Sequence, residues 1–171
     1  MPIKTTNKTI FFTSLSLVLQ KIEDSILVSL LLIMIFMAVL QIFLRNFFDS
    51  GIVWSDPLVR ILVLWIGLIG AMAASRTDNH INIDIISRFL PPHIKRFTTL
   101  VVHVFTAIIT AVMAWVSLRF VGMEMADNII AFGFIPAWVC EIIIPIAFAV
   151  ISVRYTSFSI NHLIQLFSPR P

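Results

Sequence analysis

The chain has few charged residues. Only 12% of its 171 residues are Asp, Glu, Lys or Arg, whereas 59% are hydrophobic. Its mean hydropathy is +1.01. Soluble domains carry about 25% charged residues, so this composition excludes an ordinary soluble fold. The sequence therefore indicates an integral membrane protein.

Cysteine is almost absent as well. Cys140 is the only one, which excludes a disulfide within the chain. No group of Cys and His has metal-site spacing, and no serine or cysteine stands in a nucleophile motif beside a base. Of the four histidines, only His103 falls inside an expected membrane span, whereas a bis-histidine haem needs two facing imidazoles. The sequence therefore predicts neither an enzyme nor a bound cofactor.

What the chain does have is four apolar runs long enough to cross a bilayer. They lie near residues 25–44, 54–75, 98–120 and 135–153. Ser55 is expected to cap the second helix, with Asp56 near the positive end of its dipole. We expect an all-α membrane protein with one four-helix domain over residues 1–171, including an N-terminal arm at 1–24 and a C-terminal end at 154–171.

The basic residues predict the orientation of these helices. Nine of the 12 Lys and Arg residues flank the same side: Lys4, Lys8, Lys21, Arg76, Arg88, Lys95, Arg96, Arg154 and Arg170. The other three are Arg45, Arg60 and Arg119. The positive-inside rule then puts both termini in the cytoplasm, and Trp54, Trp115 and Trp138 near the opposite membrane surface. The basic pI of about 9.5 reflects this topology rather than a nucleic-acid partner.

Two segments outside the spans are expected to be short interfacial helices. Residues 10–22 resemble either a secretory signal or an interfacial helix, and the missing small-residue cleavage site favours the helix. Residues 81–90 are expected to lie on the cytoplasmic surface until Pro91 and Pro92 end that helix.

Glu141 is the principal candidate for transport chemistry, because ionisable residues inside a span are functional by default. Arg60 lies at a similar depth of roughly 8–9 Å, which predicts a salt bridge between the two residues. The alternative is a pair between Asp56 and Arg60, one helical turn apart. Pro145 has no N–H to donate to the carbonyl of Glu141, so we expect the fourth helix to bend there. The bend could form a gate or an ion site, but we favour a static kink.

Small residues follow one another along the second span at helical spacing: Gly67, Gly70, Ala71 and Ala74. Helices in lipid associate by close packing, and such residues allow their backbones to approach. The spacing fits packing within this chain and packing against another protein equally well.

The segment around the second span is similar to a known family, the small four-helix membrane subunit of tripartite ATP-independent periplasmic (TRAP) transporters. The residues that carry this resemblance, in order, are Arg45, Trp54, Asp56, Arg60, Trp65, Gly67, Gly70, Ala71, Arg76, His80 and Asp84. Pro136, Trp138 and Pro145 continue it in the fourth span. Two features depart from the pattern. Ser55 stands where the family commonly has a first acid, and Glu141 is not part of the pattern.

The resemblance implies a scaffolding role in the cytoplasmic (inner) membrane of a bacterium or archaeon. The large subunit of such a transporter moves an organic acid with a sodium gradient, and a periplasmic substrate-binding protein delivers it. The small subunit would pack beside the large one and help to dock the binding protein. We expect the subunit interface to use Arg45, Trp54, Asp56, Arg60, Trp65, Gly67, Gly70, Glu141 and Pro145.

Arg76, His80 and Asp84 would hold the surface helix, either through mutual hydrogen bonds or through membrane lipid phosphates. The alternative for these three is a solvated loop. Two rival functions stay open: a homo-oligomeric small transporter or exporter that uses Glu141 as its coupling carboxylate, and a membrane anchor of a respiratory enzyme.

Overall fold

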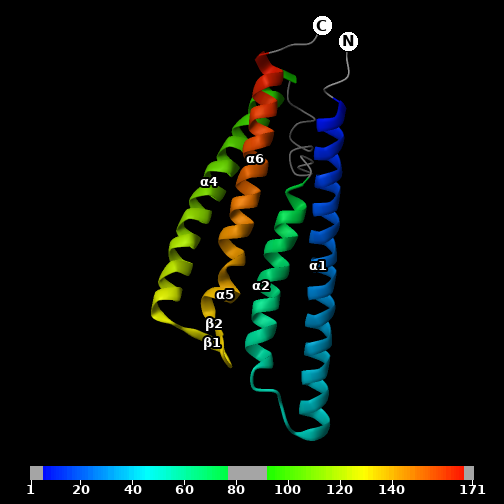
Figure 1. Cartoon of the computed structure of the whole chain (residues 1–171), viewed down its shortest axis with the longest axis vertical. Helices are drawn as coiled ribbons and strands as arrows, with labels where there is room; N and C mark the ends of the chain where they lie inside the picture. The colour runs from blue at the N-terminus through cyan, green and yellow to red at the C-terminus, as the bar shows by residue number, and fades with distance from the viewer. Residues whose placement is uncertain (1–5, 77–91, 168–171) are drawn as a thin grey trace. The chain divides into compact units, whose positions relative to one another are not determined.

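The computed structural model describes residues 6–76 and 92–167. Its elements are α1 (Thr6–Phe48), α2 (Ser55–Ala74), α4 (Pro92–Asp127), β1 (Ile130–Phe132), β2 (Ile135–Pro136), α5 (Ala137–Glu141) and α6 (Ile143–Phe167) (Figure 1). Four stretches are long and apolar enough to span a membrane: Val18–Phe48, Ser55–Ala74, Phe97–Asp127 and Ala137–Ile164. The expectation of an all-α protein with four membrane-spanning segments is confirmed.

Helix α1 is longer than the sequence predicts. Residues 10–22, expected to form a separate interfacial helix, belong to the same uninterrupted helix as the first span. No Gly or Pro occurs between Thr6 and Phe48, so nothing in this stretch breaks the backbone hydrogen bonds. The helix ends where Asp49 turns left-handed, with φ of 46°, and the Ser50 N–H donates to the Leu44 carbonyl at 3.5 Å.

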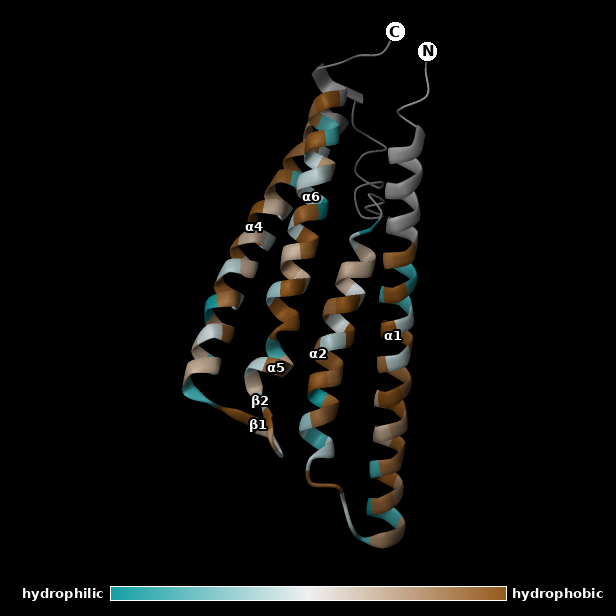
Figure 2. Cartoon of the chain, viewed as in Figure 1, coloured by the Kyte–Doolittle hydropathy of each residue, from teal (hydrophilic) through white to brown (hydrophobic). Residues whose placement is uncertain are grey.

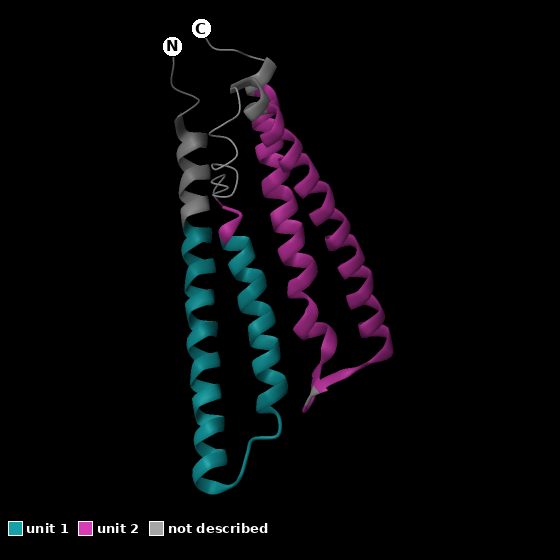
Figure 3. Cartoon of the chain, turned by 180° about the vertical axis from the view of Figure 1, so that it is seen from behind, with its two compact units in different colours: residues 1–73 teal, residues 74–171 magenta. Residues whose placement is uncertain are grey.

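The chain divides into two compact units, residues 1–73 and 74–171 (Figure 3). In the first unit, α1 and α2 are antiparallel neighbours joined by a short loop. The side chain of Gln41 stabilises this loop, because its Oε1 accepts a hydrogen bond from the Ile52 N–H at 3.1 Å. A Cβ added at Gly51 would lie 3.3 Å from Nε2 of Gln41, so glycine makes this close approach possible.

The second unit is built on the packing of α4 against α6. Its buried residues include Val121 on α4 and Ala147, Ile151 and Tyr155 on α6. The Ser152 hydroxyl of α6 donates a hydrogen bond to the Ala107 carbonyl of α4 at 3.1 Å. Figure 2 shows that hydrophobic residues dominate these helices along most of their length.

Two hydroxyl groups of α4 donate hydrogen bonds to carbonyls of their own helix. Thr110 donates to the Thr106 carbonyl at 2.7 Å, and Ser117 donates to the Met113 carbonyl at 2.6 Å. Such bonds matter in a membrane, because lipid offers no other partner for a polar group. These hydroxyls therefore do not need a polar channel.

A short hairpin connects α4 to α5. Asn128 follows α4 with φ of 51°, a left-handed conformation that asparagine tolerates at a helix end. Gly133 has φ of 58° and stands between the antiparallel strands β1 and β2. The Ala137 N–H then donates to the Ile129 carbonyl at 2.8 Å, which holds the start of α5 against the hairpin.

The fourth span is interrupted at Ile142, between α5 and α6. Pro145 lacks the N–H that would bond the Glu141 carbonyl, so the sequence predicts the position of this interruption. Ile142 keeps φ of −57° and ψ of −22°, close to 3₁₀ values, and the chain continues as helix. The predicted bounds of 135–153 need correction, because residues 135 and 136 form β2 and the span extends to Ile164.

Candidate functional site

A cavity of about 370 Å³, lined by both apolar and polar residues, lies between α1 and α2 of the first unit, near the loop that joins them. Its lining comes from both helices: Ala38, Gln41, Ile42, Ser55, Asp56, Val59 and Arg60. Two of these, Asp56 and Arg60, carry opposite charges and belong to the set that the family resemblance singles out. The sequence therefore identifies residues of α2 that line this cavity, but none of the lining residues on α1.

Ser55 differs from its predicted role. Its side chain is fully buried, and its hydroxyl has no hydrogen-bond partner among the described residues, so it does not cap α2. The helix starts one residue earlier than a Ser55 cap requires. The Ser55 N–H donates to the Ile52 carbonyl at 3.1 Å, and the Leu58 N–H donates to the Trp54 carbonyl at 3.3 Å. Trp54 thus stands at the capping position. Ser55 is among the residues around the cavity, and its hydroxyl oxygen is buried.

The predicted pairings of Arg60 stay predictions. Asp56 and Arg60 are both exposed and line the same cavity, one turn apart on α2. Arg60 lies in the first unit and Glu141 in the second.

Glu141 has a neighbour that sequence reasoning missed. One carboxyl oxygen of Glu141 and one of Glu124 are buried and have no hydrogen-bond partner in the described part of the chain, and the two carboxyl groups interact electrostatically. The expected third span ends at residue 120, whereas α4 continues to Asp127 and brings Glu124 toward α5. The absence of a proline between residues 98 and 127 is the sequence signal for this longer helix.

A second missed group surrounds His103. This residue is fully buried, and its ring lies 5.2 Å from that of His162 and 5.8 Å from that of Tyr155, centroid to centroid. The expectation that His162 follows the last span is wrong, because that span reaches Ile164. Tyr155 and His162 are seven residues apart, a spacing that places both on one helical face. The two imidazole rings therefore lie next to each other, one on α4 and one on α6.

Arg154 on α6 is hydrogen-bonded to Ser75, the residue that follows α2. Its Nη1 donates to the Ser75 hydroxyl at 3.1 Å, and Ser75 is buried. Arg76, next in the chain, is half-buried. His80 and Asp84, the other two members of the predicted lipid anchor, lie outside the described residues.

The remaining predicted interface residues differ in exposure. Arg45, Trp54 and Gly67 are exposed, whereas Trp65 is half-buried. Gly70 contacts α1, because an added Cβ would lie 3.8 Å from Cδ1 of Leu27. The small residues of α2 therefore do not act as one face. Gly70 packs within the chain, and Gly67 has open space around it, with no described atom of another element within 4 Å of an added Cβ.

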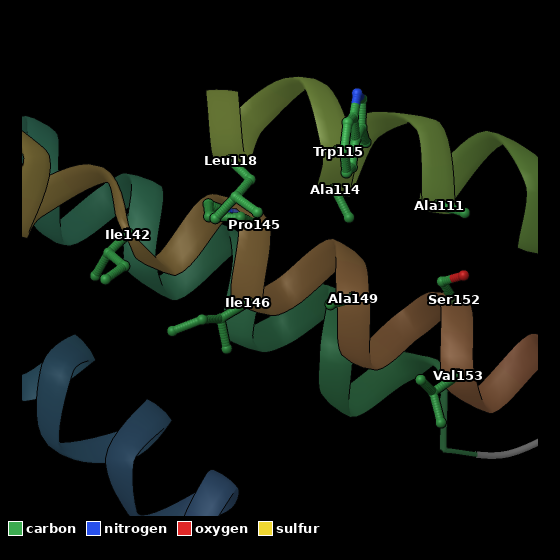
Figure 4. Close-up of a pocket in the computed structure, with 10 residues that line it drawn as sticks. All are labelled: Ala111, Ala114, Trp115, Leu118, Ile142, Pro145, Ile146, Ala149, Ser152 and Val153. Atoms are coloured by element: carbon green, nitrogen blue, oxygen red, sulfur yellow. The ribbon is translucent and has the colours of Figure 1, made fainter. Parts of the chain in front are cut away.

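A second cavity, of about 560 Å³, lies in the unit formed by α4 and α6 and is almost entirely apolar (Figure 4). The lining residues are Ala111, Ala114, Trp115, Leu118, Ile142, Pro145, Ile146, Ala149, Ser152 and Val153. Pro145, predicted to shape the fourth span, lines this cavity. Among these lining residues, only Trp115 and Ser152 have a polar group in the side chain. The Ser152 hydroxyl already donates a hydrogen bond to the Ala107 carbonyl. This cavity offers contact for apolar groups and little for a polar substrate.

These features define a helical, multi-pass membrane protein. Four apolar helices could cross a bilayer, and the described residues contain no group of three or more His, Cys, Asp or Glu placed to hold a metal ion. The family model of "Tripartite ATP-independent periplasmic transporters, DctQ component" matches residues 12–166, so the chain belongs to this family. The resemblance found in the sequence is thereby confirmed, and the chain is a component of a membrane transporter.

Individual relatives agree with this assignment. The chain is 25% identical over 122 residues to a putative TRAP transporter small permease protein of Haemophilus influenzae, covering 71% of this chain and 74% of that protein. It is 29% identical over 80 residues to the sialic acid TRAP transporter permease protein SiaT of H. influenzae, covering 47% of this chain and 13% of SiaT. It is 24% identical over 106 residues to the isethionate TRAP transporter permease protein DctMQ of Oleidesulfovibrio alaskensis, covering 61% of this chain and 17% of DctMQ.

Proposed function

We propose that this chain is the small permease subunit of a TRAP-type secondary transporter in the inner membrane. It packs beside a large, sodium-coupled membrane subunit, scaffolds it, and helps to dock a periplasmic substrate-binding protein for uptake of an organic acid. Both termini lie in the cytoplasm. SiaT and DctMQ are several times longer than the stretch this chain matches, which supports a much larger membrane region beside the matching segment. Their names, sialic acid and isethionate, support an organic acid as substrate.

The observation that carries the scaffolding role is the distribution of polar groups. The membrane helices contain few of them, and the hydroxyls of Thr110, Ser117 and Ser152 bond to backbone carbonyls of this chain. A substrate pathway through the membrane needs polar groups that face a cavity. The cavity between α4 and α6 is apolar, so a supporting role fits this chain better than a conducting one.

The exposed part of α2 is a suitable contact for a second membrane protein. Gly67 and Ala71 lie one turn apart, and both are exposed. Small residues at this spacing allow a second helix to approach closely. We therefore assign Gly67 to the interface with the large subunit, and with it the exposed residues Arg45, Trp54, Asp56 and Arg60. Arg76, His80 and Asp84 would anchor the surface segment through lipid phosphates.

The experiment compares two glycines that have open space within this chain. Gly67→Leu and Gly122→Leu each add a large side chain that meets no described atom of another element within 4 Å at its Cβ. If α2 forms the interface, Gly67→Leu lowers both co-purification with the large subunit and uptake at least tenfold, whereas Gly122→Leu changes them less than twofold. Equal retention of the large subunit by both variants would remove α2 from the interface.

A rival function has one observation in its favour. The buried, unbonded carboxyl oxygens of Glu141 and Glu124 suit a proton-coupled small transporter that works as a homo-oligomer. Transport by the purified chain alone in vesicles, abolished by Glu141→Gln, would establish this function. Uptake that requires the large subunit and persists in Glu141→Gln would exclude it.

A further inference from the structure

The hairpin between α4 and α5 exposes a large apolar surface. Residues 129–136, which include β1, β2 and the turn between them, contain no polar or charged side chain. Phe134 at the turn is 95% exposed, and Ile130 on β1 is 63% exposed. Figure 1 shows the hairpin at the end of the α4–α6 pair opposite to the C-terminal end of α6. An exposed apolar patch of this kind marks a surface that contacts a membrane or another protein.

The depth of the hairpin can be measured from the other end of the spans. Helix α2 has 20 residues and is therefore about 30 Å long, which is the thickness of the hydrocarbon core. Ser75, the next residue, then lies near one membrane surface, the cytoplasmic one in the orientation proposed above. Arg154 donates a hydrogen bond to the Ser75 hydroxyl at 3.1 Å. Arg154 is thereby placed near the same membrane surface.

The fourth span gives one estimate of the distance from Arg154 to the hairpin. Residues 137–153 are helical apart from the interruption at Ile142, and they rise roughly 26 Å. The extended residues 135 and 136 add about 7 Å. The C-terminal end of the hairpin therefore lies about 33 Å from the membrane surface near Arg154.

Helix α4 gives a second estimate. Ala107 lies near the depth of Ser152, to which it is hydrogen-bonded, and Ser152 is about 3 Å along α6 from Arg154. Asp127, the last residue of α4, lies roughly 30 Å farther along that helix. The N-terminal end of the hairpin therefore also lies about 33 Å from the same surface. The two estimates agree, although they follow different helices.

This depth corresponds to the interfacial layer of the bilayer. The hydrocarbon core is about 30 Å thick, and the whole bilayer with its headgroups is about 40–45 Å thick. Backbone N–H and C=O groups at the free strand edges can still bond water in this layer, which they could not do in the core. Apolar side chains can reach from this layer to the upper part of the acyl chains.

The apolar surface of the hairpin is continuous with that of the adjoining spans. Met125 is exposed near the end of α4, and Val139 and Ile142 are exposed at the start of the fourth span. Exposed apolar side chains within a span are suited to lipid contact. Lipid is therefore the partner that covers the hairpin without a break in this surface.

We propose that the hairpin of residues 129–136 is an interfacial anchor that inserts Phe134 into the lipid of the outer leaflet. Its partner is the region of the phospholipid glycerol and upper acyl chains, and it needs no particular headgroup. Because the Ala137 N–H bonds to the Ile129 carbonyl, the anchored hairpin also fixes the depth at which α5 begins. The outer leaflet follows from the proposed orientation, whereas the insertion requires only this chain in a bilayer. Its test therefore does not depend on the transport function.

The test measures the depth of a nitroxide label at residue 130, with Phe134 intact. Cys140, the only cysteine, is replaced by alanine, so that Ile130→Cys carries the single label. The full chain is reconstituted into vesicles of phosphatidylcholine and phosphatidylglycerol. Electron paramagnetic resonance then compares relaxation by oxygen, which partitions into lipid, with relaxation by a water-soluble nickel chelate. A high ratio of oxygen to nickel relaxation means that the label is in lipid.

Two labelled positions define the ends of this depth scale. Ser50→Cys reports water, because Phe48 lies roughly 10 Å farther along α1 than Gln41, which bonds Ile52 just before α2 begins. Val116→Cys reports the hydrocarbon core, because Val116 is exposed and lies roughly 14 Å along α4 from Ala107. We expect the ratio at residue 130 to be about fivefold higher than at residue 50 and lower than at residue 116.

A charged residue at the turn should withdraw the hairpin from lipid. Phe134→Asp should lower the ratio at residue 130 about threefold, because a carboxylate keeps its water. Phe134→Leu keeps an apolar side chain and should leave the ratio unchanged. Val53→Asp is the matched control, since Val53 is 92% exposed in the other loop on this side, and it should also leave the ratio unchanged. Circular dichroism and gel filtration establish that each variant is folded.

A ratio at residue 130 equal to that at residue 50 would overturn the proposal, because the hairpin would then lie in water. A ratio that stays the same in folded Phe134→Asp would also overturn the insertion of Phe134. Low relaxation by both oxygen and nickel would overturn it as well, since protein rather than lipid would then cover the hairpin.

Discussion

The two units of this chain bury their membrane helices to different degrees. In the most apolar window of the first span, on α1, 0% of residues are buried within the chain, against 33% in the span formed by α5 and α6. The second unit also has a hydrogen bond between α4 and α6 and a buried aromatic group around His103. The fourth span therefore has buried residues that the first span lacks, whereas the faces of α1 are available to lipid or to another protein.

The largest expected effect comes from overfilling the core of the second unit. Ala147 is fully buried, so Ala147→Leu should lower the free energy of unfolding by about 2 kcal/mol, because tight packing has no space for the added carbons. Thermal unfolding in detergent measures this change. Ala149→Leu on the same helix is the control, since Ala149 is exposed and lines the apolar cavity, and it should change stability by less than about 0.5 kcal/mol. Equal effects of the two variants would contradict the packing described for this unit.

A smaller effect is expected at the loop of the first unit. Gln41→Leu removes the hydrogen bond to the Ile52 N–H and should cost about 1 kcal/mol. Gly51→Ala should weaken the same bond, because its Cβ would push against the Gln41 amide. Hydrogen exchange of the Ile52 amide is the direct measurement, with Gly122→Ala as the control. If exchange at Ile52 is as slow in Gln41→Leu as in the wild type, the loop is held by other contacts.

The smallest effect concerns the bond between α4 and α6. Ser152→Ala removes the hydrogen bond to the Ala107 carbonyl and should cost about 0.6 kcal/mol, the average for such bonds between membrane helices. Ser157→Ala, whose hydroxyl bonds only within its own helix, should cost less. Unfolding in mixed micelles at increasing denaturant resolves the two variants. A larger loss for Ser157→Ala would show that this bond does not stabilise the unit.

Local features of the sequence predict much of the fold. The four spans follow from apolar length, and Pro145 gives the position of the interruption before α6 because a missing N–H acts within one helical turn. The wrong prediction for the N-terminal segment also comes from local sequence features. Residues 10–22 are polar enough to suggest a separate helix, yet without Gly or Pro they continue into the first span.

The sequence by itself determined that this is a four-span membrane protein of the TRAP small-subunit type, because hydropathy, proline positions and an ordered motif are properties of the chain. It also identified Asp56 and Arg60 as residues of interest. Only the tertiary structure decided that Ser55 is buried beside a cavity that Gln41 also lines, and that Glu124 approaches Glu141. These neighbours come from different helices, and the packing that brings them together depends on the whole surface of each helix.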